Sequence, residues 1–163
     1  SSVNRAFVGA IEILTGEGMV VTPTHQCGPR DYPWVRAAYE RLGVDARVHA
    51  FIDDMAEAYR DARLAVSRCG GITLAELSYL GIPAVMIPYP HAADDHQRVN
   101  GAYVAGRGGG WLIEDRELDA GRLADELKKR LTDDEGLAGA SECMRSIGLG
   151  AGADTIAREI TGV

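Results

Sequence analysis

The sequence has no long apolar run. No stretch nears the roughly 18 consecutive apolar residues that a membrane-spanning helix needs, and none has the form of a signal peptide. Basic residues are also scarce, with 17 Lys and Arg against 24 Asp and Glu. The resulting net charge of −7 argues against nucleic acid as a partner, because nucleic-acid surfaces are themselves anionic. We therefore expect a chain without a membrane segment and without a nucleic-acid partner.

Cysteine is scarce too. Cys27, Cys69 and Cys143 are scattered and odd in number, which argues against a disulfide framework and is typical of reduced thiols in a cytoplasmic protein. The chain shows no internal repeat, no low-complexity run and no linker. Its 163 residues are 46% hydrophobic and 25% charged, so they predict one soluble globular domain over residues 1–163.

Two short apolar runs organise the middle of the chain. Leu64–Val66 and Ala84–Ile87 have the length and β-branched content of buried parallel strands, and a break and then a helical pattern follow each run. Two adjacent strand-to-helix crossings place both loops at the carboxyl edge of one sheet. Because open α/β sheets bind ligands at that edge, we expect a binding site there.

The loop after the first run suits a phosphate. Gly70 and Gly71 let the backbone approach a ligand, and the N–H groups that open the following helix favour an anion, although the same glycines also fit a tight turn. Thr73 and Glu76 have the spacing of a helix capping box. The alternative is that Glu76 accepts two hydroxyls of a ribose, as acidic residues do in other nucleotide-binding folds.

The loop after the second run opens a helix with polar side chains. Asp94 and Gln97 have the spacing of a helix cap, while His96 and Asn100 share one helix face. Such a polar row at a sheet edge suits hydrogen bonds to a sugar. A metal site among the His and Asp residues of this loop is the alternative, but their spacing matches no recognised ligand pattern.

Periodicity predicts the remaining elements. Helices are expected over 3–14, 31–42, 118–131, 137–147 and 151–160, and strands over 19–22, 46–51 and 111–113. Phe51 and Ile52 follow the second of these strands, and we expect Asp53 or Asp54 to cap a short helix that runs to Tyr59.

Four strings carry a family resemblance: FIDDM at 51–55, SRCGGITLAEL at 67–77, GIPAVMIPYPHAADDHQ at 81–97, and Asn100 after them. They resemble the donor-binding half of the bacterial peptidoglycan GlcNAc transferases, which move GlcNAc from UDP-GlcNAc onto lipid I to form lipid II. The similarity runs over nearly the whole chain. It implies a Rossmann-like, doubly wound α/β fold, the C-terminal half of a GT-B glycosyltransferase that works at the cytoplasmic face of the inner membrane.

The resemblance also implies roles for residues. It implies an inverting displacement at the anomeric carbon, with no metal or other cofactor and with no catalytic residue in this chain. Phe51 would lie against the uracil, the Ile52 backbone would pair with it, and Glu76 would hold the ribose. The other residues expected to bind phosphates or sugar are Arg68, Gly71, Ile72, Thr73, His96, Gln97 and Asn100. For Arg68, a salt bridge at the strand end is the alternative.

Further parts of the family pattern bear on the beginning of the chain. The segment His25–Gly28 resembles a family loop near the donor, with Cys27 where a hydroxyl residue is usual. The strand and glycine loop that precede the first helix in the family, and the half that binds lipid I, are expected upstream of Ser1, so the chain alone is expected to be inactive. The alternatives are a stand-alone UDP-GlcNAc-binding subunit with a separate membrane acceptor subunit, and a sugar-nucleotide epimerase, whose acid/base residues we do not find.

Overall fold

The computed structural model describes residues 1–91 and 95–149. They fall into two compact units. The first unit comprises residues 1–61 and 117–129, and the second comprises residues 62–116 and those from 130 onwards. The helix expected over 151–160 and the predicted cap Asp94 lie outside the described residues. The expectation of one domain over 1–163 stays a prediction.

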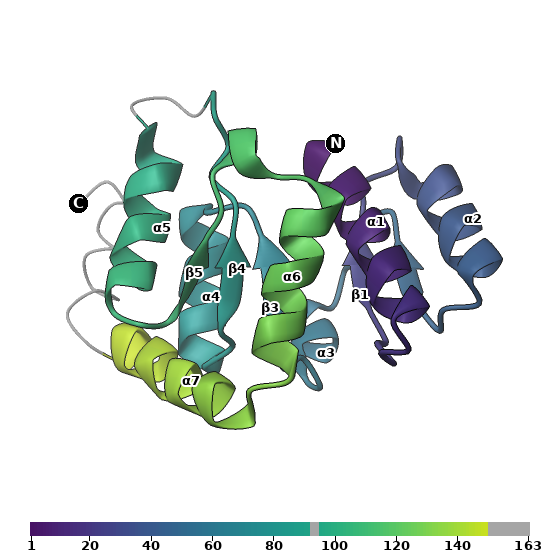
Figure 1. The fold of residues 1–163 in the computed structure, drawn as a ribbon. Coiled ribbons are helices and arrows are strands. Elements are labelled where there is room, and N and C mark those ends of the chain that lie inside the picture. The colour runs from purple at the N-terminus through teal and green to yellow at the C-terminus, as the bar shows by residue number, and fades with distance from the viewer. Residues whose placement is uncertain (92–94, 150–163) are drawn as a thin grey trace. The chain divides into compact units, whose positions relative to one another are not determined.

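The first unit contains a pair of parallel strands. Strand β1 (Thr24–Gln26) pairs with β2 (Arg47–His49), with Gln26 opposite His49. Its helices are α1 (Ser2–Gly16), α2 (Tyr32–Leu42), α3 (Met55–Tyr59) and most of α6 (Ala120–Leu131). Helices α1 and α2 pack side by side (Figure 1) and bury Ala10, Ile11, Leu14, Val35 and Tyr39.

The second unit contains a three-stranded parallel sheet. Its strands β3 (Ala65–Ser67), β4 (Ala84–Met86) and β5 (Gly110–Leu112) lie in sequence order. Helices α4 (Gly71–Leu80) and α5 (His96–Gly106) connect them, the 3₁₀ turn η2 (Asp115–Glu117) follows β5, and α7 (Asp134–Leu149) packs on α4. This arrangement confirms the α/β class and the two neighbouring parallel strands with helical crossovers.

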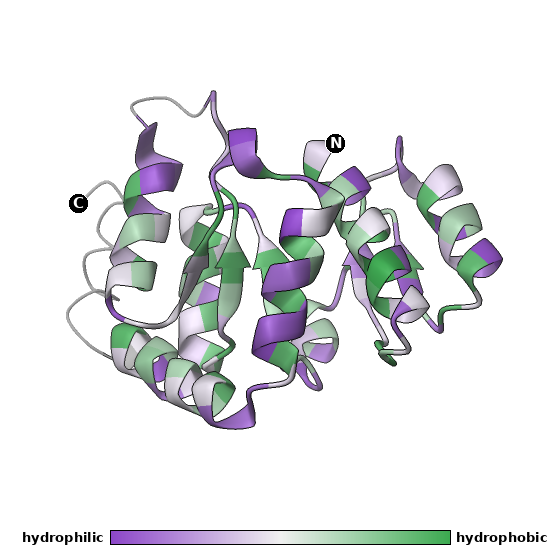
Figure 2. Cartoon of the chain, viewed as in Figure 1, coloured by the Kyte–Doolittle hydropathy of each residue, from purple (hydrophilic) through white to green (hydrophobic). Residues whose placement is uncertain are grey.

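The middle strand is the most buried part of this sheet. Ala84, Val85 and Met86 are all 0% exposed, as expected for a parallel strand that is covered on both faces. Figure 2 shows hydrophobic colouring along β4, whereas the surrounding helices carry both colours. None of the helices among the described residues is long and apolar enough to cross a membrane.

The strand predicted over residues 19–22 is wrong. The strand is Thr24–Gln26, and its pairing with β2 begins where the N–H of Arg47 donates to the carbonyl of Pro23, at 2.9 Å. Val20 precedes this ladder and is 92% exposed. The position of the partner strand β2, and not the local β preference of Val20 and Val21, therefore decides where the strand forms. For the same reason β2 ends at His49, before the predicted limit of 51.

The capping box was one of two interpretations that the spacing of Thr73 and Glu76 left open, and Thr73 does not cap the helix. Helix α4 begins at Gly71, its N-cap is Gly70 in an extended conformation, and no side chain caps it. Thr73 therefore lies inside the first turn, too late to act as the cap. The predicted cap of the short helix α3 is confirmed at Asp54, which accepts a hydrogen bond from the Glu57 N–H at 3.0 Å.

Candidate functional site

The two loops at the carboxyl edge of β3 and β4 are joined by one side chain. The Gln97 Oε1 atom accepts the N–H of Cys69 at 3.2 Å and the N–H of Tyr89 at 3.0 Å. Asn100 lies one turn further along α5, and its Nδ2 donates to the Cys69 carbonyl at 3.2 Å. The structure thus brings the predicted residues Gln97 and Asn100 onto the loop that precedes α4, and their role in binding a substrate stays a prediction.

Arg68 supports the same pair of loops. Its Nη1 donates to the carbonyl of Pro88 at 2.9 Å and to Oδ1 of Asp115 at 2.6 Å. The guanidinium carbon lies 5.4 Å from the ring centroid of Tyr89, within the range of a cation–π contact. These contacts show Arg68 as a salt-bridge partner at the end of β3, which is the alternative that the sequence left open.

Among the described residues, no side chain caps the N-terminus of α4. Gly70 carries no side chain that could cap the helix, and the N–H groups of Gly71, Ile72 and Thr73 lie in the first turn, where a helix has no partners of its own. Ile72 is 64% exposed. The positive end of the helix dipole adds to the preference for negative charge. Glu76 lies one turn further along the same helix and is partly exposed.

The remaining candidates in this unit are His96 and Cys69. His96 is exposed at the first residue of α5. Cys69 is fully buried, and burial raises the pKa of its thiol to about 12, so it is a protonated packing residue and a poor nucleophile. Over residues 1–91 and 95–149, no three or more His, Cys, Asp or Glu side chains are grouped to hold a metal ion.

Phe51 and Ile52 lie in the first unit, just beyond β2. The Phe51 side chain is 70% exposed. The backbone N–H of Ile52 donates to Oε1 of Gln26 at 2.8 Å, and Gln26 is the last residue of the neighbouring strand β1. The family resemblance points to Phe51 and Ile52 but not to Gln26, because the contact of Gln26 with Ile52 depends on the pairing of two strands.

His25 is the centre of a buried network in the first unit. Asn4 Nδ2 donates to the Cys27 carbonyl at 2.8 Å and to Asp31 at 2.7 Å. The Asn4 Oδ1 atom therefore accepts from His25 Nε2–H at 3.2 Å, and the His25 Nδ1 atom accepts from the Tyr39 hydroxyl at 3.0 Å. Burial lowers the pKa of His25 to about 4, so the imidazole is neutral. This network fixes the loop after β1.

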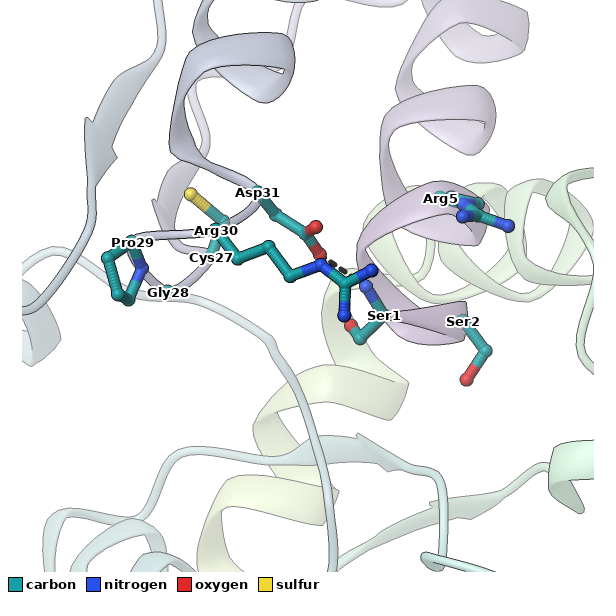
Figure 3. Close-up of a pocket in the computed structure, with 8 residues that line it drawn as sticks. All are labelled: Ser1, Ser2, Arg5, Cys27, Gly28, Pro29, Arg30 and Asp31. Atoms are coloured by element: carbon teal, nitrogen blue, oxygen red, sulfur yellow. Dashed lines mark hydrogen bonds and ion pairs between the residues drawn. The ribbon is translucent and has the colours of Figure 1, made fainter.

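A hollow beside this network was not predicted. Figure 3 shows it, with Asp31 and the side chain of Arg30 extending toward the start of α1. Hydrogen bonds from the Ser1 amino group, from Trp34 and from Asn4 hold the pKa of Asp31 below its usual range. No spacing signals this site, because Asn4 and Asp31 are 27 residues apart. The lining residues are Ser1, Ser2, Arg5, Cys27, Gly28, Pro29, Arg30 and Asp31.

Parallel strands whose loops meet at one edge, with a glycine-opened helix at that edge, define a Rossmann-like nucleotide-binding fold as a class. Residues 1–157 match the model of the glycosyltransferase family 28 C-terminal domain, and the chain belongs to that family.

Individual relatives agree with this assignment. The chain is 43% identical over 126 residues to the UDP-N-acetylglucosamine–N-acetylmuramyl-(pentapeptide) pyrophosphoryl-undecaprenol N-acetylglucosamine transferase of Rhodospirillum rubrum, a match that covers 77% of this chain and 33% of that protein. The transferase of the same name from Alkalilimnicola ehrlichii is 42% identical over 134 residues, covering 82% of this chain and 38% of its own length. The chain thus spans about a third of the length of these curated relatives.

Solved structures show the same likeness. The crystal structure of MurG from Acinetobacter baumannii matches with a TM-score of 0.79 and 25% identity, over 99% of this chain and 48% of that chain. The glycotransferase of kitacinnamycin, with a TM-score of 0.60 and 24% identity over 94% of this chain and 38% of its own, shares the fold. The resemblance to the peptidoglycan GlcNAc transferases, and to their C-terminal GT-B domain, is confirmed.

Proposed function

We propose that this chain is the donor-binding part of an inverting glycosyltransferase that moves GlcNAc from UDP-GlcNAc to lipid I and so forms lipid II. The observation that carries the proposal is the joining of two loops by Gln97 at the carboxyl edge of β3 and β4, beside the uncapped start of α4. The names of the relatives, whose length the chain covers in part, support the donor and the acceptor.

The start of α4 receives the pyrophosphate in this proposal. The first-turn N–H groups of Gly71, Ile72 and Thr73 donate to phosphate oxygens, and the helix dipole stabilises the negative charge that develops as UDP leaves. The attack by the acceptor hydroxyl inverts the anomeric carbon in a single displacement. The N–H groups at the start of α4 belong to the fixed backbone, so they need no rearrangement as the charge develops on the phosphate.

The sugars are assigned to side chains of α4 and α5. Glu76 accepts the ribose hydroxyls. The Oε1 atom of Gln97 already holds two backbone N–H groups, so its Nε2 group is the part that donates to GlcNAc hydroxyls. Asn100 and His96 complete this polar row. Arg68 acts indirectly, because its hydrogen bonds to Pro88 and Asp115 hold the second loop in place.

The nucleobase contacts are assigned to Phe51 and Ile52 in this proposal. The uracil stacks on the exposed ring of Phe51 and pairs with the backbone of Ile52. Lipid I, the general base and the contact with the cytoplasmic face of the membrane are assigned to a part of the enzyme other than this chain. The chain by itself therefore binds the donor without transferring GlcNAc.

A titration of the chain with sugar nucleotides tests the proposal. Isothermal titration calorimetry should show saturable binding of UDP-GlcNAc, and no comparable response to ADP-glucose or GDP-mannose at the same concentrations. A folded sample that responds to all three alike, or to none, would overturn the proposal.

The ribose contact has a sharper test in Glu76→Gln. A hydrogen bond to a charged group contributes about 1.5–3 kcal/mol, so we expect the affinity for UDP-GlcNAc to fall by about tenfold or more. Glu142→Gln makes the same change at an exposed position of α7 and should leave the affinity unchanged. Equal affinities for the two variants would remove Glu76 from the site.

A further inference from the structure

Two acidic residues follow the third strand of the second unit, at the same edge of the sheet as the two proposed donor loops. The N–H of Ile113 donates to the Met86 carbonyl at 2.9 Å and continues the ladder between β4 and β5. Glu114 and Asp115 come directly after it. Because the carboxyl ends of parallel strands meet at one edge, these carboxylates lie beside the loops after β3 and β4.

Asp115 acts on the loop after β4 through Arg68. The Nη1 group of Arg68 donates to Oδ1 of Asp115 at 2.6 Å and to the carbonyl of Pro88 at 2.9 Å, so it links the segments that follow β3, β4 and β5. The side chains of Arg68 and Asp115 are only 27% and 22% exposed, so water and salt screen this ion pair less than a surface pair. The guanidinium also lies against the ring of Tyr89, whose N–H donates to Oε1 of Gln97.

Glu114 acts on the first turn of α5 through Arg98. Its Oε1 lies 3.1 Å from Nε of Arg98, which immediately follows Gln97 in the chain. Among the described residues no side chain caps α5, so contacts with neighbouring segments fix this turn. The Arg98 side chain is 56% exposed, and the pair of Glu114 with Arg98 is therefore the weaker of the two.

We propose that Asp115 and Glu114 are positioning residues for the sugar end of the donor, which hold Gln97 from two sides. Asp115 fixes the loop that Gln97 binds, and Glu114 fixes the turn that carries Gln97. A carboxylate facing the pyrophosphate would repel it, whereas each of these two is paired with an arginine. The inference rests on the proposed function, since it takes the Nε2 group of Gln97 to donate to GlcNAc.

The test compares the affinities for UDP-GlcNAc and UDP by isothermal titration calorimetry. Asp115→Ala should lower the ratio of the UDP-GlcNAc affinity to the UDP affinity by about three- to tenfold, the range of one or two neutral hydrogen bonds. The affinity for UDP itself should hold, because the backbone at the start of α4 is unchanged. Glu114→Ala should lower the ratio less, since its ion pair is more exposed. Asp45→Ala removes an exposed carboxylate before β2 and should leave the ratio as it was.

A double variant separates positioning from direct contact. Gln97→Glu keeps the Oε1 acceptor that joins the two loops but loses the Nε2 donor. If Asp115 acts through Gln97, adding Asp115→Ala to Gln97→Glu lowers the ratio no further. A second fall as large as that of Asp115→Ala alone would show that Asp115 acts independently of Gln97, and it would overturn the inference.

Asp115→Asn serves where Asp115→Ala does not fold, as judged by circular dichroism. It keeps a neutral acceptor for Arg68, so the ratio should fall by only about two- to threefold. An unchanged ratio in the folded variant, or an equal loss of both affinities, overturns the inference and leaves the proposed function standing, since the carboxylates then support only the fold. An unaltered chain that binds neither nucleotide overturns the proposed function itself.

Discussion

At the scale of the residue, His25 ties the stability of the chain to pH. Its imidazole is buried between Tyr39 and Asn4, and burial lowers its pKa from 6.5 to about 4. Between these values the unfolded chain takes up a proton that the folded chain does not. Stability is therefore complete above pH 6.5 and falls as the pH drops toward 4, by about 3 kcal/mol from this residue.

Urea unfolding at pH steps from about 7 to about 4.5 checks this prediction. His25→Gln removes the titrating group and should flatten the dependence, even if the variant is less stable throughout. His96→Gln, at an exposed histidine, should keep the full slope. Identical slopes for the unaltered chain and His25→Gln would show that His25 is not buried as a neutral group.

Some of these residues can be predicted from the sequence and others cannot, for a physical reason. Gln97 and Asn100 could be placed at the sheet edge because they follow the second buried run, and the loops after neighbouring parallel strands meet at one edge of the sheet. The contacts of Asn4 with Asp31 and of Gln26 with Ile52 could not, because they join segments that only the fold brings together. Local spacing contains no information about such pairs.

At the scale of the element, the packing of α4 on α7 depends on Gly148. A Cβ at this position would lie 2.8 Å from the carbonyl oxygen of Ser78 and 3.0 Å from the backbone nitrogen of Tyr79. Both are backbone atoms of α4, which cannot rotate away as a side chain can. We expect Gly148→Ala to force the helices apart and to lower the free energy of unfolding by about 1–3 kcal/mol.

Gly139→Ala is the matched control in the same helix. Apart from its chain neighbours and the backbone of its own helix, no atom of the described residues lies within 4 Å of a Cβ placed at Gly139. Since alanine is the better helix former, this variant should gain about 0.5–1 kcal/mol. Thermal melts of the two variants measure the difference, and Gly148→Ala should have the lower melting temperature. A Gly148→Ala chain as stable as Gly139→Ala would mean that α4 and α7 do not approach as closely as the structure shows.

Element prediction succeeded where the chain itself sets the boundary and failed where a partner does. Gly43 adopts a left-handed conformation with φ of 65° and ends α2 as expected. The capping-box interpretation of α4 failed, because the extended backbone of Gly70 begins the helix before Thr73. The position of β1 differed because pairing with β2, and not the Val-Val preference at 20–21, selects the strand.

At the scale of the whole molecule, the excess of acidic residues determines how the chain behaves in solution. The net charge is −7 at pH 7, and the isoelectric point is about 5.0. Charge repulsion between copies disappears near that pH, and His25 lowers the stability of the fold over the same interval. We expect light scattering to rise most steeply near pH 5.0 as the pH is lowered from neutral.

The two causes can be separated with one variant. His25→Gln keeps the acidic charge balance but removes the titrating group from the core. It should therefore aggregate at the same pH, through loss of charge alone. Its denaturant midpoint should no longer fall over that pH interval. The opposite result would be scattering that follows the unfolding midpoint in both chains and does not depend on net charge. Exposure of the core would then be the cause of aggregation, and the acidic surface would have no role in keeping the copies apart.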